Sequence, residues 1–257
     1  MTRVHFCTYL YSKMINTYNE SNLHKTFKEI YAENDTDKLE AEADGHIYDI
    51  LREDGSVIEI QTQGLSKLLS KISDALSKNR RVTVVHPLAV QKTILLNDLN
   101  GKKIYARKSP DTKSIYALFR ELTGLYPVLL DDKFTLEVPL VKITEIRIRT
   151  EEPVQSKNKR RRFKRNWLKT NKRLDDIMDT MQFKTASDYL ALLPKSLAEP
   201  FTARELKTAM IQEGLSRKDA ANAHLILWVL ARMNLIEYIG SKNKSRAYKI
   251  TPFNNTL

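Results

Sequence analysis

Two carboxylates lie ten residues apart in HIYDILREDGSVIEIQTQ, the segment from His46 to Gln63. Asp49 and Glu59 have isoleucine neighbours, a composition typical of two short strands around a turn. An unpaired buried charge is costly, so carboxylates that converge within such strands indicate a metal site more than packing. Magnesium prefers hard oxygen ligands, which Asp49, Glu59, the backbone carbonyl of Ile60 and water would supply. Such an ion stabilises the attacking and leaving oxygens of an in-line displacement.

The geometry of the turn decides whether the two carboxylates meet. A two-residue Asp54-Gly55 turn would send Glu59 to the other face of the hairpin, whereas a three-residue loop with a left-handed Gly55 pairs Asp49 with Glu59. We predict the three-residue loop, because side-chain alternation then gives one dry face and one chemical face. The dry face is Tyr48, Ile50, Ile58 and Ile60; the chemical face is Ile47, Asp49, Leu51, Val57, Glu59, Gln61 and Gln63. The alternative is a hairpin whose carboxylates lie at a sheet edge and pair with lysines.

The segments around the hairpin predict an alternating order of helices and strands. Apolar residues at helical spacing indicate an amphipathic helix before it, marked by Leu23, Phe27, Ile30 and Tyr31, and another over residues 65–77. The β-branched run at residues 81–86 then predicts a buried strand that lies parallel to its neighbour. The expected order is helix, strand with Asp49, strand with Glu59, helix, strand.

With this order, residues 20–90 resemble the core of the PD-(D/E)XK nuclease superfamily. The resemblance implies that Asp49 and Glu59 bind one or two Mg²⁺ or Mn²⁺ ions. It places Gln61 where the family has a lysine that orients the attacking water. It also implies an assisting glutamate on the first helix, for which Glu20 is the first candidate, before Glu29 and Glu33.

Gln61 is the departure from the family pattern. A neutral amide can position a water but supplies no positive charge to the developing transition state. Either the site tolerates glutamine, or a lysine reaches in from elsewhere, or the site no longer cuts. Lys71 is the candidate for a migrated lysine, because it flanks the apolar arc of the helix over residues 65–77. The alternative is that Lys71 only solvates the outer face of that helix.

Composition places the chain among ordinary folded proteins. It has 42% hydrophobic content and a formal net charge of +12. Its 257 residues are enough for two domains, each with its own hydrophobic core. A single cysteine, Cys7, excludes a disulfide framework and fits a reducing cytoplasm, where we expect Cys7 to pack. No run suggests a membrane span or a signal peptide. The oligomeric state stays open between a monomer and a homodimer.

Ten lysines or arginines and no acid lie between Lys157 and Arg173. We predict that residues 151–173 form a basic linker between a nuclease-like domain (1–150) and a C-terminal domain (174–257). A phosphate backbone is the natural partner of such a run, with salt-dependent and sequence-independent binding. Phe163 and Trp167 could stack on bases or pack against a helix. The linker residues expected to bind nucleic acid are Arg160, Arg161, Arg162, Lys164 and Arg165.

Three helix starts in the C-terminal stretch have the form of a capping box, at Thr185, Thr202 and Ser216. They predict helices over 185–193, 202–211 and 216–233, with Gly214 making the turn before the third, followed by a hairpin with a basic tip. This order resembles a winged helix-turn-helix domain, which implies that the third helix and the wing contact DNA. The residues concerned are Arg217, Lys218, Asn222, Lys242, Lys244 and Arg246. Winged helices also serve as docking modules, which is the alternative.

The expected fold is an α/β (α+β) restriction-endonuclease-like core with a central mixed sheet, plus a small, mostly helical winged-helix domain. The expected function is magnesium-dependent endonuclease activity on duplex or branched DNA. Two other hypotheses stay open: a DNA-binding or regulatory protein whose nuclease-like domain is inactive, and an adaptor that docks a protein partner.

Overall fold

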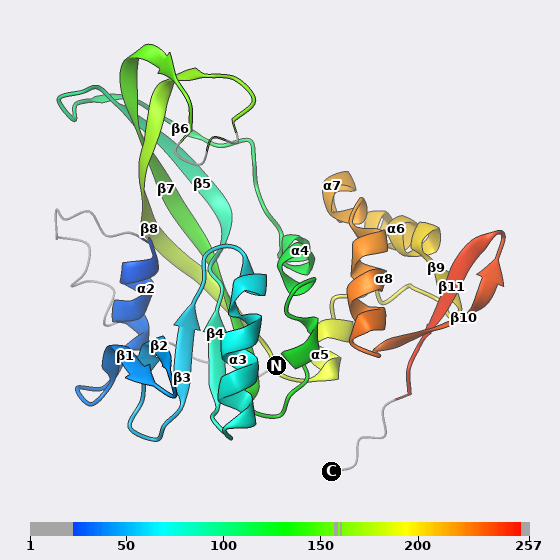
Figure 1. The fold of residues 1–257 in the computed structure, drawn as a ribbon. Helices are drawn as coiled ribbons and strands as arrows, with labels where there is room; N and C mark the ends of the chain where they lie inside the picture. The colour runs from blue at the N-terminus through cyan, green and yellow to red at the C-terminus, as the bar shows by residue number, and fades with distance from the viewer. Residues whose placement is uncertain (1–22, 157–158, 160, 253–257) are drawn as a thin grey trace.

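The computed structural model of the chain describes residues 23–156, 159 and 161–252, and it is an α+β fold around a central mixed sheet (Figure 1). The strands are β1 (Lys38–Ala43), β2 (His46–Leu51), β3 (Val57–Ile60), β4 (Val82–Val85), β5 (Leu88–Asn97), β6 (Lys103–Lys108), β7 (Phe134–Val154), β8 (Arg165–Phe183), β9 (Phe201–Thr202), β10 (Ile236–Lys242) and β11 (Ser245–Ile250). The α-helices are α2 (Leu23–Tyr31), α3 (Leu69–Ser77), α4 (Leu118–Leu122), α5 (Ala186–Leu190), α6 (Ala203–Gln212), α7 (Arg217–Ala220) and α8 (Ala223–Arg232).

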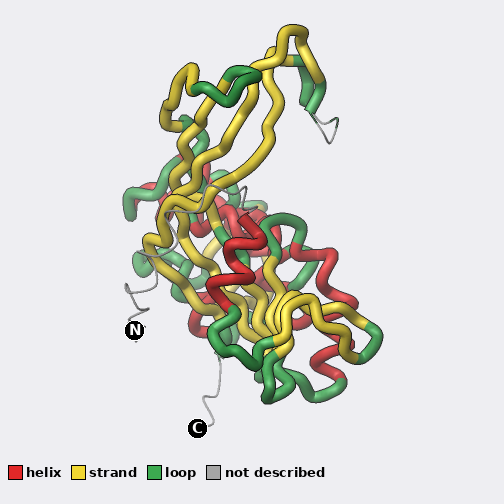
Figure 2. Tube along the Cα trace, turned by 90° about the vertical axis from the view of Figure 1, so that its left-hand side faces the viewer, coloured by secondary structure: helices red, strands yellow, loops and turns green. Residues whose placement is uncertain are grey.

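The large sheet has eight strands in the order β1-β2-β3-β4-β7-β5-β6, with β8 paired to β7. β1, β2 and β3 are antiparallel, whereas β3, β4 and β7 run parallel, as expected for the run at residues 81–86. The first part of β7 pairs with β4 and its later part with β5. As a result, β5 to β8 leave the body of the molecule together as a long twisted arm (Figures 1 and 2).

Two apolar clusters hold the sheet between helices. The smaller one joins Leu23 and Phe27 of α2 to Ile50, Ile58 and Ile60, all of them buried. The larger one contains Ile72 of α3, the segment from Tyr116 to Leu129, and most of the C-terminal apolar residues. Because burial of apolar area is the main favourable term in folding, the continuous larger cluster ties the C-terminal unit to the sheet.

The C-terminal unit consists of short helices packed on a three-stranded sheet with the order β10-β11-β9. Two predicted capping boxes are present, Thr185 with Asp188 and Thr202 with Glu205. Ser216 caps α7 by accepting a hydrogen bond from the Asp219 N–H. The predicted third helix is divided into α7 and α8, and its first turn is bound to the loop before α4 through Ser114, whose hydroxyl donates to Asp219 Oδ1.

The prediction of a linker over residues 151–173 is wrong. Residues 134–154 and 165–183 are the two paired strands of one long hairpin, with Arg149 opposite Trp167 and Glu145 opposite Lys172. Few residues of this stretch are apolar, which resembles a linker, but cross-strand pairs between long polar side chains stabilise a solvated ladder. The body of the sheet therefore extends to Phe183, and the C-terminal unit begins at Thr185.

No helix among the described residues is long and apolar enough to cross a membrane. Three residues singled out in the sequence, Cys7, Glu20 and Arg160, lie outside the described residues.

Candidate functional site

The hairpin of β2 and β3 has the predicted turn. Ile50 pairs with Ile58 and Leu51 with Val57, a register that brings Asp49 level with Glu59. Arg52 N–H donates to Ser56 O at 2.9 Å, which leaves Glu53, Asp54 and Gly55 as a three-residue loop. Gly55 has φ +78°, the left-handed conformation that this loop requires at that position.

The backbone ladder of this hairpin opens where the two carboxylates lie. Beyond the Ile50–Ile58 pair, the Ile60 N–H donates to Asp49 Oδ2 at 2.8 Å. The Asp49 N–H in turn donates to Glu59 Oε1 at 3.3 Å. The Ile60 N–H therefore bonds a side chain where a regular ladder would offer the Tyr48 carbonyl, the Asp49 N–H turns to the side chain of its partner Glu59, and the two carboxylates bridge the opening.

The two carboxylates turn toward different helices. Asp49 lies beside α2, with Oδ1 2.9 Å from Lys28 Nζ and Oδ2 3.3 Å from His24 Nε2. Glu59 forms an ion pair with Lys71 of α3. The two carboxylates therefore do not share one chemical face, because the side chain of Asp49 turns toward α2 and that of Glu59 toward α3. The assignment of Tyr48 to the dry face of the hairpin is also wrong. Tyr48 packs in the α3 cluster, not with Ile50 and Ile58.

Lys71 reaches the candidate site, as the sequence suggested it could. Its ammonium contacts Glu59, donates to Ile47 O, and lies 4.7 Å from the centre of the Tyr48 ring. The side chain of Glu59 is only 6% exposed and that of Lys71 is 19% exposed, so the pair is largely shielded from water. The expectation that carboxylates of this hairpin pair with lysines is met for both acids, but in the interior of the sheet and not at its edge.

The two carboxyl groups have opposite pKa perturbations. Burial acts to raise the pKa of Asp49, but hydrogen bonds from His24, Lys28 and the Ile60 N–H outweigh it and lower the pKa to about 2. Burial raises the pKa of Glu59 above its ordinary value, although Lys71 acts against it. Asp49 is therefore ionised at neutral pH, whereas Glu59 is the acid whose charge depends on a neighbouring cation.

Gln61 does not contact either carboxylate through its side chain. Its Nε2 donates to Gln63 O at 2.6 Å, and its carbonyl lies 2.6 Å from Nδ1 of the buried His86. Burial lowers the pKa of His86. The side-chain amide of Gln61 therefore stays within its own loop, and the side chain that pairs with Glu59 is Lys71.

The donor atoms fit a hard divalent cation in kind but are few. Asp49 and Glu59 offer carboxylate oxygens, the ligand type that magnesium prefers, beside the backbone of Ile60. No group of three or more His, Cys, Asp or Glu side chains suited to a metal occurs within residues 23–156, 159 and 161–252. In this structure Lys28 and Lys71 compensate the negative charges of Asp49 and Glu59, which a bound cation would otherwise neutralise.

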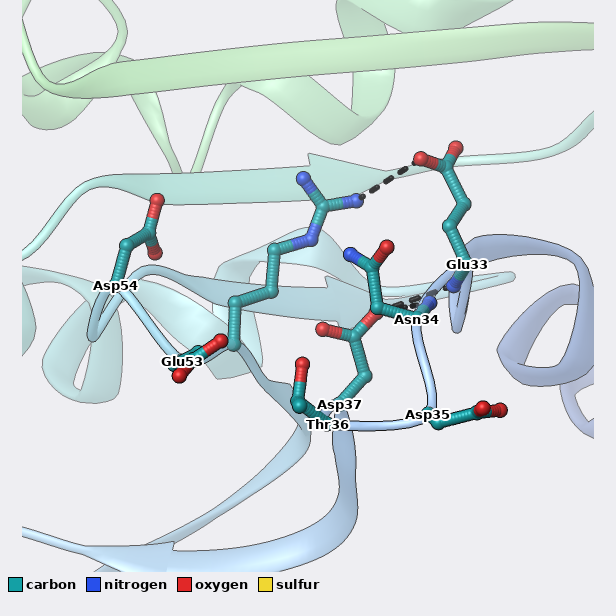
Figure 3. A pocket seen from close by; sticks show the side chains of 8 residues that line it. Glu33, Asn34, Asp35, Thr36, Asp37, Glu53 and Asp54 are labelled. Atoms are coloured by element: carbon teal, nitrogen blue, oxygen red, sulfur yellow. Dashed lines mark hydrogen bonds and ion pairs between the residues drawn. The ribbon is translucent and has the colours of Figure 1, made fainter.

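A separate acidic hollow of about 800 Å³ lies between the α2–β1 loop and the β2–β3 turn (Figure 3). Asp37 Oδ2 accepts from the backbone N–H groups of Glu33 and Asn34, at 3.1 and 3.2 Å. Arg52, which also lines the hollow, approaches Glu33 at 3.9 Å. These contacts account for the loop conformation, and neither Asp49 nor Glu59 lines the hollow.

The predicted nucleic-acid-binding residues are spread over two places. Arg161 donates to Val154 O and Trp167 O, and Trp167 is stacked between Arg161 at 4.0 Å and Arg147 at 3.6 Å. Arg162 lies over Phe163. Trp167 therefore packs against cations of its own hairpin. Exposed side chains in the same hairpin are Arg162, Lys164 and Arg165.

In the C-terminal unit, several predicted DNA contacts have protein partners. Lys218 is 2.8 Å from Asp111 and donates to Thr112 O, and Lys242 pairs with Glu205. Asn222 Nδ2 donates weakly to Lys218 O at 3.4 Å. The remaining members, which are exposed, are Arg217, Lys244 and Arg246.

Sequence reasoning missed His24, Lys28 and His86. His24 and Lys28 are four residues apart, so they lie on one face of α2, and this spacing beside a carboxylate-bearing strand was the available signal.

Comparison with known proteins adds a family but no activity. No solved structure matches the chain. An uncharacterized protein of Treponema pallidum (strain Nichols) is 26% identical over 192 residues, which covers 75% of this chain and 73% of that protein. A family model described as a domain of unknown function, DUF8091, matches residues 21–184, more than half of the chain and the whole of the sheet with its arm. The chain belongs to the DUF8091 family.

Proposed function

We propose that this protein is a divalent-metal-dependent phosphodiesterase that cuts nucleic acid at the opened hairpin of β2 and β3. The observation that carries the proposal is the pair of carboxylates bridging the opening, each bonded to a backbone N–H of the other's strand. The element order α2, β1–β3, α3, β4, with antiparallel and then parallel pairing, supports a restriction-endonuclease-like core. Its substrate would be DNA.

Each residue of the candidate site would have its own role in the reaction. Asp49, Glu59 and the carbonyl of Ile60 would hold Mg²⁺ or Mn²⁺, which supplies charge stabilisation to the attacking and leaving oxygens. Asp49 is suited to this because its carboxylate stays ionised at neutral pH. Lys71 contacts Glu59 and would turn its positive charge toward a phosphate once the ion neutralises that glutamate. Gln61 would play no direct part, since its amide is bonded to Gln63.

The C-terminal unit supports a nucleic-acid substrate. Its element order and its β10-β11-β9 sheet resemble a winged helix, and Lys244 and Arg246 lie exposed on the β10–β11 hairpin. The first turn of the third helix is bound to Asp111 and Ser114, so we assign DNA contact to the wing and not to that helix.

The second candidate function is nucleic-acid binding without cleavage. The observation that favours it is charge balance: Lys28 and His24 surround Asp49, and Lys71 pairs with Glu59, so the pair needs no metal to be compensated. The glutamine at position 61 fits the same interpretation.

A cleavage assay separates the two candidates. Supercoiled, branched and single-stranded DNA would be incubated with the chain and Mg²⁺ or Mn²⁺, with Glu59→Gln and Lys71→Met as site variants. Asp35→Asn, an exposed acid in the α2–β1 loop, is the matched control. The enzyme hypothesis expects metal-dependent cutting that only the site variants lose, by a factor of at least about 100. Binding without cutting on every substrate would establish the second candidate.

A further inference from the structure

A lysine-rich face lies on the inner strands of the arm, at the end nearest the candidate site. Lys92 of β5 is opposite Ile143 of β7, and Lys172 of β8 is opposite Glu145. Residues opposite one another, and residues two apart along a strand, share a face of a sheet. Lys92 and Lys172 therefore lie on one face, on either side of β7, separated by two strand spacings across it and by two residues along it, about 12 Å between their backbones.

Further basic side chains lie near Lys92 and Lys172. Lys169 is 3.0 Å from Glu145, and Arg147 bonds the same carboxylate at 2.6 Å. Lys113, in the loop before α4, is exposed and lies two residues beyond Asp111, whose carboxylate is 3.6 Å from Lys92 Nζ. Two carboxylates, Glu145 and Asp111, face a larger number of basic groups: Lys92, Lys113, Arg147, Lys169 and Lys172.

Lys172 is the member of this face that most needs an anion. It is half-buried, and no ion pair or hydrogen bond from its ammonium is found within the described part of the chain. Burial and the neighbouring lysines lower its pKa to about 8. The attraction of an anion placed among these side chains would offset both the repulsion between the lysines and the desolvation cost of Lys172.

The lysine face is linked to the candidate site through the ends of β3 and β4. His86 follows β4 and lies 2.6 Å from the carbonyl of Gln61, and β5, the strand that carries Lys92, begins two residues later at Leu88. Gln61 is two residues beyond Glu59. We propose that the lysine face formed by Lys92, Lys113, Lys169 and Lys172 binds a backbone phosphate of the nucleic acid that passes the Asp49–Glu59 pair. The assignment of the partner rests on the proposed function.

The test measures binding in the absence of cleavage. Affinity of the full chain for a fluorescent DNA duplex would be followed by anisotropy in EDTA, over a range of salt concentrations. The variants are Lys172→Gln and Lys113→Gln, the second in an exposed loop where loss of folding is not expected. Lys207→Gln, on the exposed side of α6, removes the same charge elsewhere. Because EDTA abolishes any metal-dependent cutting, the result does not depend on whether the chain is an enzyme.

Each site variant is expected to weaken binding about eightfold at 0.1 M salt and to reduce the slope of log K against log salt by about 0.9, the effect of one lost phosphate contact. Lys207→Gln should leave both unchanged. Wild-type affinity and slope in folded Lys113→Gln and Lys172→Gln would overturn the proposal. Pyrophosphate that protects Lys172 from amine acetylation, where DNA does not, would overturn the assignment to nucleic acid.

Discussion

Replacing Asp49 with asparagine should remove a contribution to stability that depends on pH. The pKa of Asp49 falls from an ordinary value of 3.8 to about 2 in the folded chain. At roughly 1.4 kcal/mol for each pKa unit, the ionised carboxylate stabilises the fold by about 2 kcal/mol. Because the folded pKa is the lower one, this stability is present above pH 3.8 and is lost as pH falls through about 2. Its side chain is only 15% exposed, so little of the effect is screened by solvent.

The assay is urea unfolding of wild type and Asp49→Asn between about pH 6 and pH 2. Asparagine keeps an acceptor for the Ile60 N–H, so the comparison isolates the charge. The destabilisation caused by Asp49→Asn should be about 2 kcal/mol greater at pH 6 than at pH 2. Asp35→Asn controls for the loss of a negative charge. A difference between wild type and Asp49→Asn that stays constant over this range would refute the reasoning.

Three further substitutions test the ion pair of Glu59 and two contacts in the core of the fold. Lys71→Met should raise the pKa of Glu59 further, observable by NMR titration, whereas Lys67→Met, exposed on the same segment, should not. Tyr116→Phe removes a buried bond to Leu192 O and should cost about 1 kcal/mol in unfolding experiments; an unchanged midpoint would count against that contact. Gly124→Ala would place a Cβ 2.2 Å from Ser66 Cβ and 2.9 Å from its Cα, so it should destabilise the chain by about 1–3 kcal/mol or more. A wild-type thermal midpoint in Gly124→Ala would contradict the packing described here.

Local sequence signals predict the hairpin well and its distortion poorly. Gly55 and the apolar alternation were sufficient to predict a three-residue loop and the register that brings Asp49 level with Glu59. The assignment of Tyr48 failed because alternation assumes a regular ladder. Here the Asp49 N–H bonds a side chain of the other strand, so the backbone of β2 departs from that regularity.

Alternation over residues 135–150 predicts most of the first strand of the hairpin, but β8, its second strand, was missed because the stability of β8 comes from partners distant in sequence. The stretch after residue 150 has few apolar residues, and each of its strands is stabilised by cross-strand pairs and by the stacking of Trp167 between Arg147 and Arg161. None of these contacts leaves a periodic signal in one strand alone. The same holds for Lys28, whose role depends on how α2 packs across the hairpin.

Metal binding at the Asp49–Glu59 pair can be measured without knowing the substrate, and it is the most direct test of the central proposal. Titration of Mn²⁺ into the wild-type chain, followed by electron paramagnetic resonance, should show a bound ion. That bound ion should disappear in Asp49→Asn and in Glu59→Gln and persist in Asp35→Asn. The proposal is contradicted if folded wild type binds no Mn²⁺, or if Asp49→Asn binds it equally well. The ion pairs of Lys28 with Asp49 and of Lys71 with Glu59 would then compensate the two carboxylates without a metal ion.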